Sequence, residues 1–330
     1  MNKKRWIALI LFIGLLAISL PLQVATLDEI RMFDSRDLVE TRLEPGDEGV
    51  IVVLKVQGVI TDSLPSDYFY DQYYRHDFFL RQLRDAYQNP DVRAVVLHIN
   101  SPGGGISESD EIFHRIMQLK RENPKPLVVY MDKVATSGGY YISSPADHIV
   151  ATRNTITGSI GVILQGINYH QLAENWGVSD VTVKSGPYKD LLNPFREVEE
   201  SERLLLQALI DESYDYFIDA IVSGRGMDRD QVLALADGRI YTGAQALENG
   251  LVDSLGFFED ALSEAKELAG VEKPEVLLLE PDSRFNWRTF LAGRSDSGLL
   301  GQVLRDLYGN VPGQPVSVRQ HPVPMYLWTW

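Results

Sequence analysis

The spacing of apolar residues along the chain alternates between two patterns. Residues 49–56 and 92–99 are continuous runs of apolar and β-branched residues, which predict buried strands. Residues 108–121 carry apolar side chains at helical spacing, which predicts an amphipathic helix. Strand alternating with helix indicates an α/β architecture in which helices cover a largely parallel sheet.

The same alternation continues through the middle of the chain. Residues 127–142 predict a strand, a turn that contains serine and a short helix. Shorter patterns predict further strands at 149–151, 162–167 and 180–183, and helices at 78–87, 169–176, 228–236 and 243–249.

A long amphipathic helix is predicted at residues 199–222, where the chain leaves the alternating pattern. Leu206, Ile210, Phe217 and Ile221 lie on its apolar side. Long helices after an α/β core often carry contacts between subunits. We expect this helix to pack on the core of its own chain.

The N-terminal residues hold a basic cluster followed by an uncharged run. Lys3, Lys4 and Arg5 precede residues 6–25, which include no charged residue. A helix over most of this run would be roughly 25 Å long, near the lower limit for crossing a bilayer. Two interpretations stay open, a retained transmembrane anchor and a cleaved signal peptide. An anchor would place the basic cluster in the cytoplasm and the body on the other side of the membrane.

The C-terminal residues 281–330 are predicted to form a poorly packed tail with scattered glycine, proline and arginine. Residues 325–330 hold two tryptophans, a tyrosine, a leucine and a methionine. Such an apolar tip is not expected to remain free in water. Three destinations are open: its own core, the interface of a bilayer, and the apolar groove of an active site.

Composition excludes several classes of function. The formal net charge of −15 argues against a nucleic-acid partner, because a phosphate-binding surface needs a basic excess. The chain has no cysteine, so disulfides, thiolate metal sites and a cysteine nucleophile are excluded. We expect no metal and no other cofactor.

Three short motifs carry candidate chemistry. Ser137 lies in residues 135–141 (ATSGGYY), between a predicted strand and a predicted helix. A serine here can be a nucleophile, although serine also often serves as a helix cap. Residues 184–190 (KSGPYKD) offer a lysine as its base, and residues 100–105 (NSPGGG) offer backbone N–H groups for an oxyanion. These parts are the minimum for acyl transfer.

A lysine is the expected base because none of the six histidines has a recognisable spacing from Ser137. An exposed lysine is protonated at neutral pH and cannot accept a proton, whereas burial favours the neutral amine. Lys184 and Lys189 are both candidates, and sequence position does not separate them. Apolar neighbours of Lys189 could supply the buried environment.

The glycine loop does not match a nucleotide-binding turn. The P-loop pattern is absent, and Glu108 stands where the dinucleotide pattern requires its third glycine. Backbone N–H groups of this loop, together with that of Gly138, fit an oxyanion hole instead.

In this order, the motifs closely resemble the signal peptide peptidase A family, the membrane-anchored serine–lysine proteases of bacteria, in its short single-repeat form. The resemblance runs from about residue 50 to about residue 262 and includes TGSIGV at 157–162, DGRIYTG at 237–243 and NGLVD at 249–253. It implies the Clp protease/crotonase-like spiral of ββα units, with an N-terminal transmembrane helix and a C-terminal helical extension. It also implies assembly into a ring or dome.

The resemblance further implies roles for individual residues. Lys189 directly precedes the aspartate of the family's K-S-G-x-x-K-D pattern and takes the place of the base. Ser159, 22 residues beyond Ser137, takes the place of the serine that orients this lysine. Either Gly103 or Gly104 takes the place of the oxyanion donor, and the resemblance leaves that choice open.

The preferred interpretation is a membrane-tethered serine endopeptidase that cleaves remnant signal peptides and other apolar, unfolded segments. Its expected partners are such peptides, the membrane and further copies of the chain. The expected divisions are a cytoplasmic tip and transmembrane anchor at 1–25, a linker at 26–48, a protease domain at 49–280 and a tail at 281–330. The anchor places the protease domain outside the inner membrane.

Three alternatives are weighed against this interpretation. One is a related serine–lysine protease that acts on a stomatin-like membrane protein. Another is a crotonase-type acyl-CoA enzyme, which needs no serine–lysine pair and rarely an anchor. The third is a catalytically inactive scaffold on the same fold, which the intact Ser137, Lys189 and Ser159 disfavour.

Overall fold

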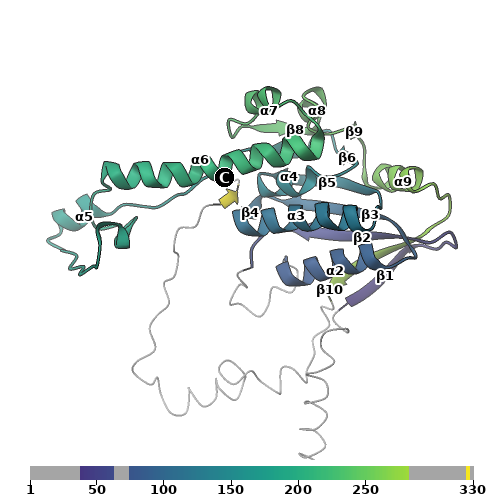
Figure 1. Ribbon diagram of the computed structural model, residues 1–330, viewed down its shortest axis with the longest axis horizontal. Helices are drawn as coiled ribbons and strands as arrows, with labels where there is room; N and C mark the ends of the chain where they lie inside the picture. The colour runs from purple at the N-terminus through teal and green to yellow at the C-terminus, as the bar shows by residue number, and fades with distance from the viewer. Residues whose placement is uncertain (1–37, 63–73, 282–324, 328–330) are drawn as a thin grey trace, which may run out of the picture.

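The computed structural model describes residues 38–62, 74–281 and 325–327 (Figure 1). The predicted anchor at residues 1–25 and most of the predicted tail lie outside the described residues. Within the described part of the chain, no helix is both long enough and apolar enough to cross a membrane.

The described residues form one sheet of nine strands, in which most neighbouring strands are parallel. The main order is β1-β10-β2-β3-β5-β6-β9; β7 pairs with the end of β5, and β8 pairs with β7. The pairs β1·β10 and β7·β8 are antiparallel. The strands are β1 (Leu38–Glu44), β2 (Val50–Gln57), β3 (Val92–Ser101), β5 (Leu127–Thr136), β6 (His148–Ala151), β7 (Ile156–Gly158), β8 (Ile240–Thr242), β9 (Ser254–Leu255) and β10 (Glu275–Pro281).

Helices cover both faces of the sheet. Successive side chains of a strand point to opposite faces, so Val52 and Leu54 of β2 join the core beneath α2, α3, α4 and α6, while Ile51 and Val53 pack beneath α9. The helices are α2 (His76–Gln88), α3 (Ile106–Glu122), α4 (Gly138–Ser143), α5 (His170–Asn175), α6 (Glu200–Arg225), α7 (Arg229–Leu235), α8 (Gly243–Glu248) and α9 (Phe258–Ala269).

Most of the predicted elements are present. The apolar runs at 49–56 and 92–99 are β2 and β3, and the predicted long helix is α6. Several strands were not expected. Among them, β1 falls inside the segment that we interpreted as a linker, and it pairs at the edge of the sheet with β10, which was also not predicted. The structure therefore confirms a mixed α/β fold built on a sheet.

Two predicted strands, at 162–167 and 180–183, are wrong. Their apolar and β-branched residues lie in an extended segment of residues 162–199, here called the arm, which also contains α5 and the short 3-10 helix η1 (Pro187–Asp190). Val183 is 97% exposed. Strand propensity reflects packing on a half-buried sheet, and the arm offers these residues no sheet to join.

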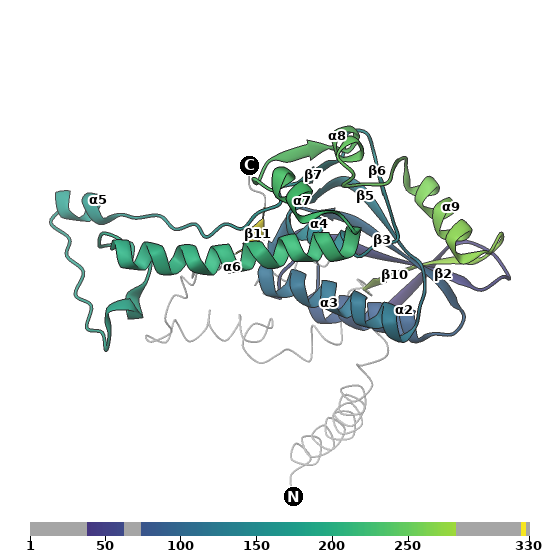
Figure 2. The same ribbon diagram turned by 45° about the horizontal axis from the view of Figure 1, so that its top comes forward.

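Helix α6 connects the arm to the body. Near its C-terminal end Phe217, Ile218 and Ile221 are fully buried in the core. Its N-terminal end and α5 project away from the sheet (Figures 1 and 2), and Leu204 and Leu209 are exposed there. The expectation that this helix packs on its own core therefore holds only for its C-terminal part.

Phe217→Ala should lower the free energy of unfolding by about 3–5 kcal/mol, because it removes a fully buried ring and leaves a cavity. The matched control is Phe257→Ala, since Phe257 is 67% exposed; it should change the free energy by less than about 0.5 kcal/mol. Urea unfolding followed by circular dichroism at one protein concentration measures both. Equal losses would contradict the assignment of this end of α6 to the core.

Candidate active site

Ser137 occupies a strained turn between β5 and α4. Its φ of 54° and ψ of −117° are unusual for a residue with a side chain, and such a conformation costs about 1–3 kcal/mol. The backbone holds it in place from both sides: Ser137 N–H donates to Gly158 O at 2.8 Å, and Tyr141 N–H donates to Ser137 O at 2.9 Å. A strained serine at a sharp strand-to-helix turn is the geometry of a nucleophile elbow.

The hydroxyl of Ser137 is buried but unpaired. The residue is 1% exposed, and its Oγ has no hydrogen-bond partner among the described residues. The hydroxyls of Thr136 and Ser109 are buried and unpaired in the same way. Buried hydroxyls normally find partners, so these unpaired groups mark a candidate functional site.

Ser109 was not found from the sequence. It lies in the first turns of α3, just after the glycine loop, and its Oγ is 2.5 Å from the point that a Cβ on Gly138 would occupy. A side chain at Gly138 would therefore collide with this hydroxyl. The available signal was a serine four residues beyond Gly105, at the start of a helix.

The glycine loop forms β4 (Gly103–Gly105), and its hydrogen bonds distinguish the three glycines. Gly103 N–H donates to Ser101 Oγ at 3.1 Å. Gly105 N–H donates to Ile60 O at 2.8 Å, and Gly103 O accepts from Ile60 N–H at 2.9 Å. Backbone groups alternate between the two edges of a strand, so the Gly104 N–H faces the edge opposite Ile60.

Gly104 also lies against the turn that holds Ser137. Its N atom is 3.1 Å from the point that a Cβ on Gly138 would occupy. Gly103 and Gly105 already use their N–H groups, so Gly104 is the member of the loop that can face a substrate carbonyl together with Gly138.

A short strand from the C-terminal region, β11 (Met325–Leu327), pairs with β4. The pairing is antiparallel and joins Met325 to Gly105 and Leu327 to Gly103. Of the three destinations open for the C-terminal tip, this pairing corresponds to the third: the backbone of Met325–Leu327 lies along the glycine loop of the candidate active site.

Ser159 lies beside Ser137 at the end of the neighbouring strand. Thr136 of β5 pairs with Gly158 of β7, and each serine directly follows one of these residues. Ser159 has a positive φ of 50° and is almost fully buried. Its N–H donates to Arg239 O at 2.8 Å, which fixes this turn.

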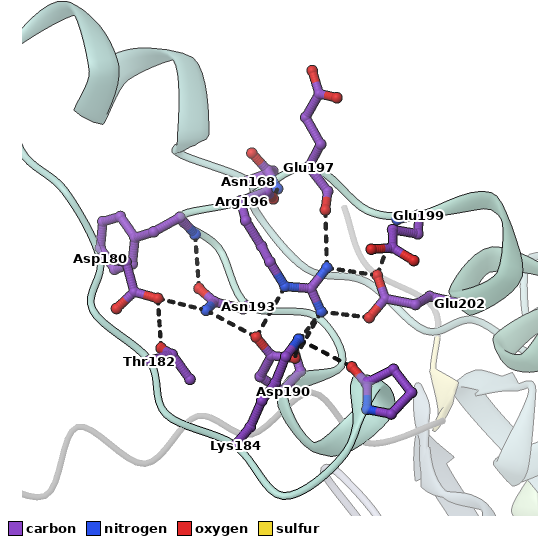
Figure 3. Close-up of polar contacts among 12 residues, drawn as sticks. Asn168, Asp180, Thr182, Lys184, Asp190, Asn193, Arg196, Glu197, Glu199 and Glu202 are labelled. Carbon is purple, nitrogen blue, oxygen red and sulfur yellow. Dashed lines mark hydrogen bonds and ion pairs between the residues drawn. The ribbon is translucent and has the colours of Figure 1, made fainter.

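The structure separates the two candidate lysines by their partners. Lys184 Nζ donates to Asp190 Oδ1 at 2.6 Å and to Pro187 O at 3.1 Å (Figure 3). Lys189 has no side-chain hydrogen bond or ion pair among the described residues, and it is exposed. The expected burial of Lys189 is thus absent from the single chain, because the arm carries it away from the body.

A single chain does not bring Lys189 to Ser137. Tyr141, one helical turn after Ser137, packs against Phe217 of α6 in a tilted arrangement, with ring centroids 4.9 Å apart. Asp190, next to Lys189, is instead tied through Arg196 to Glu202 near the other end of α6. The α6 segment between Glu202 and Phe217 spans about 22 Å at 1.5 Å per residue.

Comparisons with known proteins identify the family of this chain. The model of "Peptidase family S49" matches residues 119–272, a range that includes Ser137, Ser159 and Lys189. A protein of Enterococcus faecium named "Putative signal peptide peptidase SppA" is 42% identical over 281 residues, which is 81% of each chain. A chloroplastic serine protease SPPA of Arabidopsis thaliana is 33% identical over 61% of this chain and 30% of that protein.

Among solved structures, a mutant of the membrane-bound stomatin-specific protease 1510-N matches with a TM-score of 0.45 and 16% identity, over 72% of this chain and 100% of that one. This likeness is too low to add to the assignment. The 42% identity over four fifths of the Enterococcus faecium protein is sufficient on its own. This chain belongs to peptidase family S49 and is a serine peptidase.

Proposed function

We propose that the chain is a serine endopeptidase in which Ser137 is the nucleophile and Lys189 the general base, with Gly104 and Gly138 binding the oxyanion. Its substrates are remnant signal peptides and other apolar, extended segments. Ser137 carries the proposal: its backbone is strained, its buried hydroxyl has no partner among the described residues, and Gly138, the next residue, lies against Gly104 N. An inactive scaffold has no need to keep a serine in such a conformation.

The arrangement supports a complete acyl-transfer cycle. Ser137 Oγ attacks the carbonyl carbon of the scissile bond while the neutral amine of Lys189 takes the hydroxyl proton. The N–H groups of Gly104 and Gly138 stabilise the resulting oxyanion. Lys189 then donates the proton to the leaving amine, and a water activated by the same lysine hydrolyses the acyl-enzyme. Ser159 orients the lysine amine toward Ser137.

Lys189 is a better candidate than Lys184 because its amine is not engaged by any other described residue. Lys184 Nζ already donates to Asp190 Oδ1 at 2.6 Å and to Pro187 O at 3.1 Å, contacts that hold it within the arm. Lys189 has no carboxylate partner in the described part of the chain. Burial against another surface would therefore favour its neutral form.

A second copy of the chain would provide that surface. In one chain, Lys189 is held near the N-terminal end of α6, whereas the turn with Ser137 lies near its C-terminal end. We therefore propose that the arm of one copy places Lys189 beside Ser137 of another. The arm and the projecting part of α6 expose large apolar side chains, which mark an interaction surface: Ile167, Trp176, Val181, Val183 and Leu204. This assembly would form the ring or dome that the family resemblance implies.

The pairing of β11 with β4 supports an extended substrate. An unfolded peptide can add to the exposed edge of a strand through its backbone, while pockets select its side chains. The edge of β4 already accepts one apolar segment, Met325–Leu327. A peptide bound in the same way would pass the Gly104 N–H and lie close to Ser137.

We further propose where this peptidase is located and which fold family its sheet belongs to. The uncharged run at residues 6–25 would tether the peptidase to the inner membrane, with its catalytic part outside the cytoplasm. Membership of peptidase family S49 supports the Clp protease/crotonase-like spiral that the resemblance implies. A protease for a stomatin-like membrane protein remains the second candidate and would use the same catalytic residues.

Ser137→Ala and Lys189→Ala should each abolish cleavage of an apolar peptide, because nucleophile and base act as a unit. Lys184→Ala is the matched control and should lower kcat by about tenfold or less, since Asp190 keeps Arg196 as a partner. Peptide turnover measures activity, and thermal unfolding checks the fold. An active Lys189→Ala with an inactive Lys184→Ala would reverse the choice of base.

Deleting residues 311–330 should raise activity on short peptides, because the deletion frees the edge of β4 for substrate. Turnover at low peptide concentration measures the effect, and light scattering checks that assembly is unchanged. Unchanged activity together with loss of binding to lipid vesicles would show that the tip serves the membrane instead.

A further inference from the structure

The arm is attached to α6 by one arginine between two carboxylates (Figure 3). Arg196 donates to Asp190 through Nε at 2.9 Å and through Nη2 at 2.8 Å. Its other side donates to Glu202, through Nη1 at 2.7 Å and through Nη2. Both contacts are bidentate, which fixes the orientation of the guanidinium plane as well as its distance.

Each carboxylate belongs to a different element. Asp190 is the last residue of η1 and directly follows Lys189. Glu202 lies in the first turn of α6, is 1% exposed, and accepts the Glu199 N–H at 3.0 Å as part of the helix cap. Arg196 therefore joins the turn that carries Lys189 to a rigid helix.

The remaining contacts of this network anchor Asp190 from its other side. Lys184 Nζ is 2.6 Å from Asp190 Oδ1. Asn193 Nδ2 lies 3.5 Å from Asp190 Oδ2 and 2.9 Å from Asp180 Oδ2. Lys184 does not contact Glu202, so Arg196 is the cation that links the two carboxylates in the described part of the chain.

We propose that Arg196 is a positioning residue of the peptidase: it clamps η1 to the first turn of α6 and so holds Lys189 where it reaches Ser137 of another copy. This inference rests on the proposed function. It assigns a role to a residue that touches neither the substrate nor Ser137.

Charge explains why this clamp depends on arginine. Hydrogen bonds from Arg196 hold the pKa of the Asp190 carboxyl and that of the Glu202 carboxyl below their usual ranges, so both are ionised at neutral pH. Without Arg196, two carboxylates would face each other, one of them buried and without a cation. Repulsion would then separate η1 from α6 and move Lys189.

Small displacements of a base are costly, since a shift of about 1 Å can lower a rate by about 100-fold. Arg196→Gln should therefore lower kcat by about 100-fold and change KM by less than about twofold, because the peptide edge at β4 is untouched. Arg196→Lys keeps the positive charge but loses the planar guanidinium that makes both bidentate contacts. Its kcat should lie between that of Arg196→Gln and that of the unmodified protein.

The test uses the full-length chain in its assembled state, with an apolar peptide as substrate and light scattering to follow assembly. The matched control is Arg203→Gln. Arg203 lies beside Glu202 in the first turn of α6, is exposed, and pairs with Glu200 at 3.6 Å. It should change kcat by less than about twofold. Glu202→Gln added to Arg196→Gln should cause little further loss, because the two residues act as a unit.

The outcomes separate this inference from the proposed function. If Ser137→Ala and Lys189→Ala are inactive but Arg196→Gln matches Arg203→Gln, the positioning role is wrong and the proposed function stands. If both Arg196 variants lose assembly in proportion to activity, Arg196 is only structural and the inference is overturned. If Ser137→Ala and Lys189→Ala remain active, both proposals fail.

Discussion

Helix α6 of this peptidase is buried in the core at one end and exposed at the other, and the position of Lys189 depends on this. Phe217, Ile218 and Ile221 fix its C-terminal part in the core beside α4. The part near Glu202 leaves the body and carries the arm (Figure 2). A long helix is rigid, so it keeps Lys189 of a chain away from Ser137 of the same chain. The exposed apolar residues of the arm form the surface that, in the proposed assembly, another copy covers.

The turn at Ser137 is the second constraint, and it is local. Its strained backbone is maintained by hydrogen bonds from two directions and by the buried helix that follows. Gly138 is packed tightly in this turn. A side chain at this position would collide with Ser109 Oγ and would lie 3.1 Å from Gly104 N. The core thus offsets the cost of holding one serine in an unfavourable conformation, as is common at functional sites.

Local patterns predicted much of the fold, because β2, β3, α3 and α6 bury a continuous run or a helical stripe that the sequence displays. The strands predicted at 162–167 and 180–183 failed for the opposite reason: their residues favour strands, but no sheet lies beside them. Strand β1 was missed because it is polar and exposed at the edge of the sheet. Its pairing with β10, more than 200 residues away, has no local signal.

The same division applies to the site. Motifs pointed to Ser137, Ser159 and the glycine loop, and the structure brings these together. The choice of Gly104 over Gly103 needed the hydrogen bonds of Ser101 and Ile60, which no pattern reveals. The separation of Lys189 from Ser137 could not be predicted either, because it depends on the direction in which the arm leaves the body.

The most direct test of the central claim, an active site shared between copies, is to assemble two inactive chains together. Ser137→Ala and Lys189→Ala chains, co-expressed in equal amounts, would place an intact Ser137 beside an intact Lys189 in about a quarter of the sites if neighbours mix at random. The account predicts that the mixture recovers peptide cleavage to about that fraction, while each variant alone stays inactive. A mixture as inactive as its components, with mixed assemblies demonstrated by two affinity tags, would contradict it.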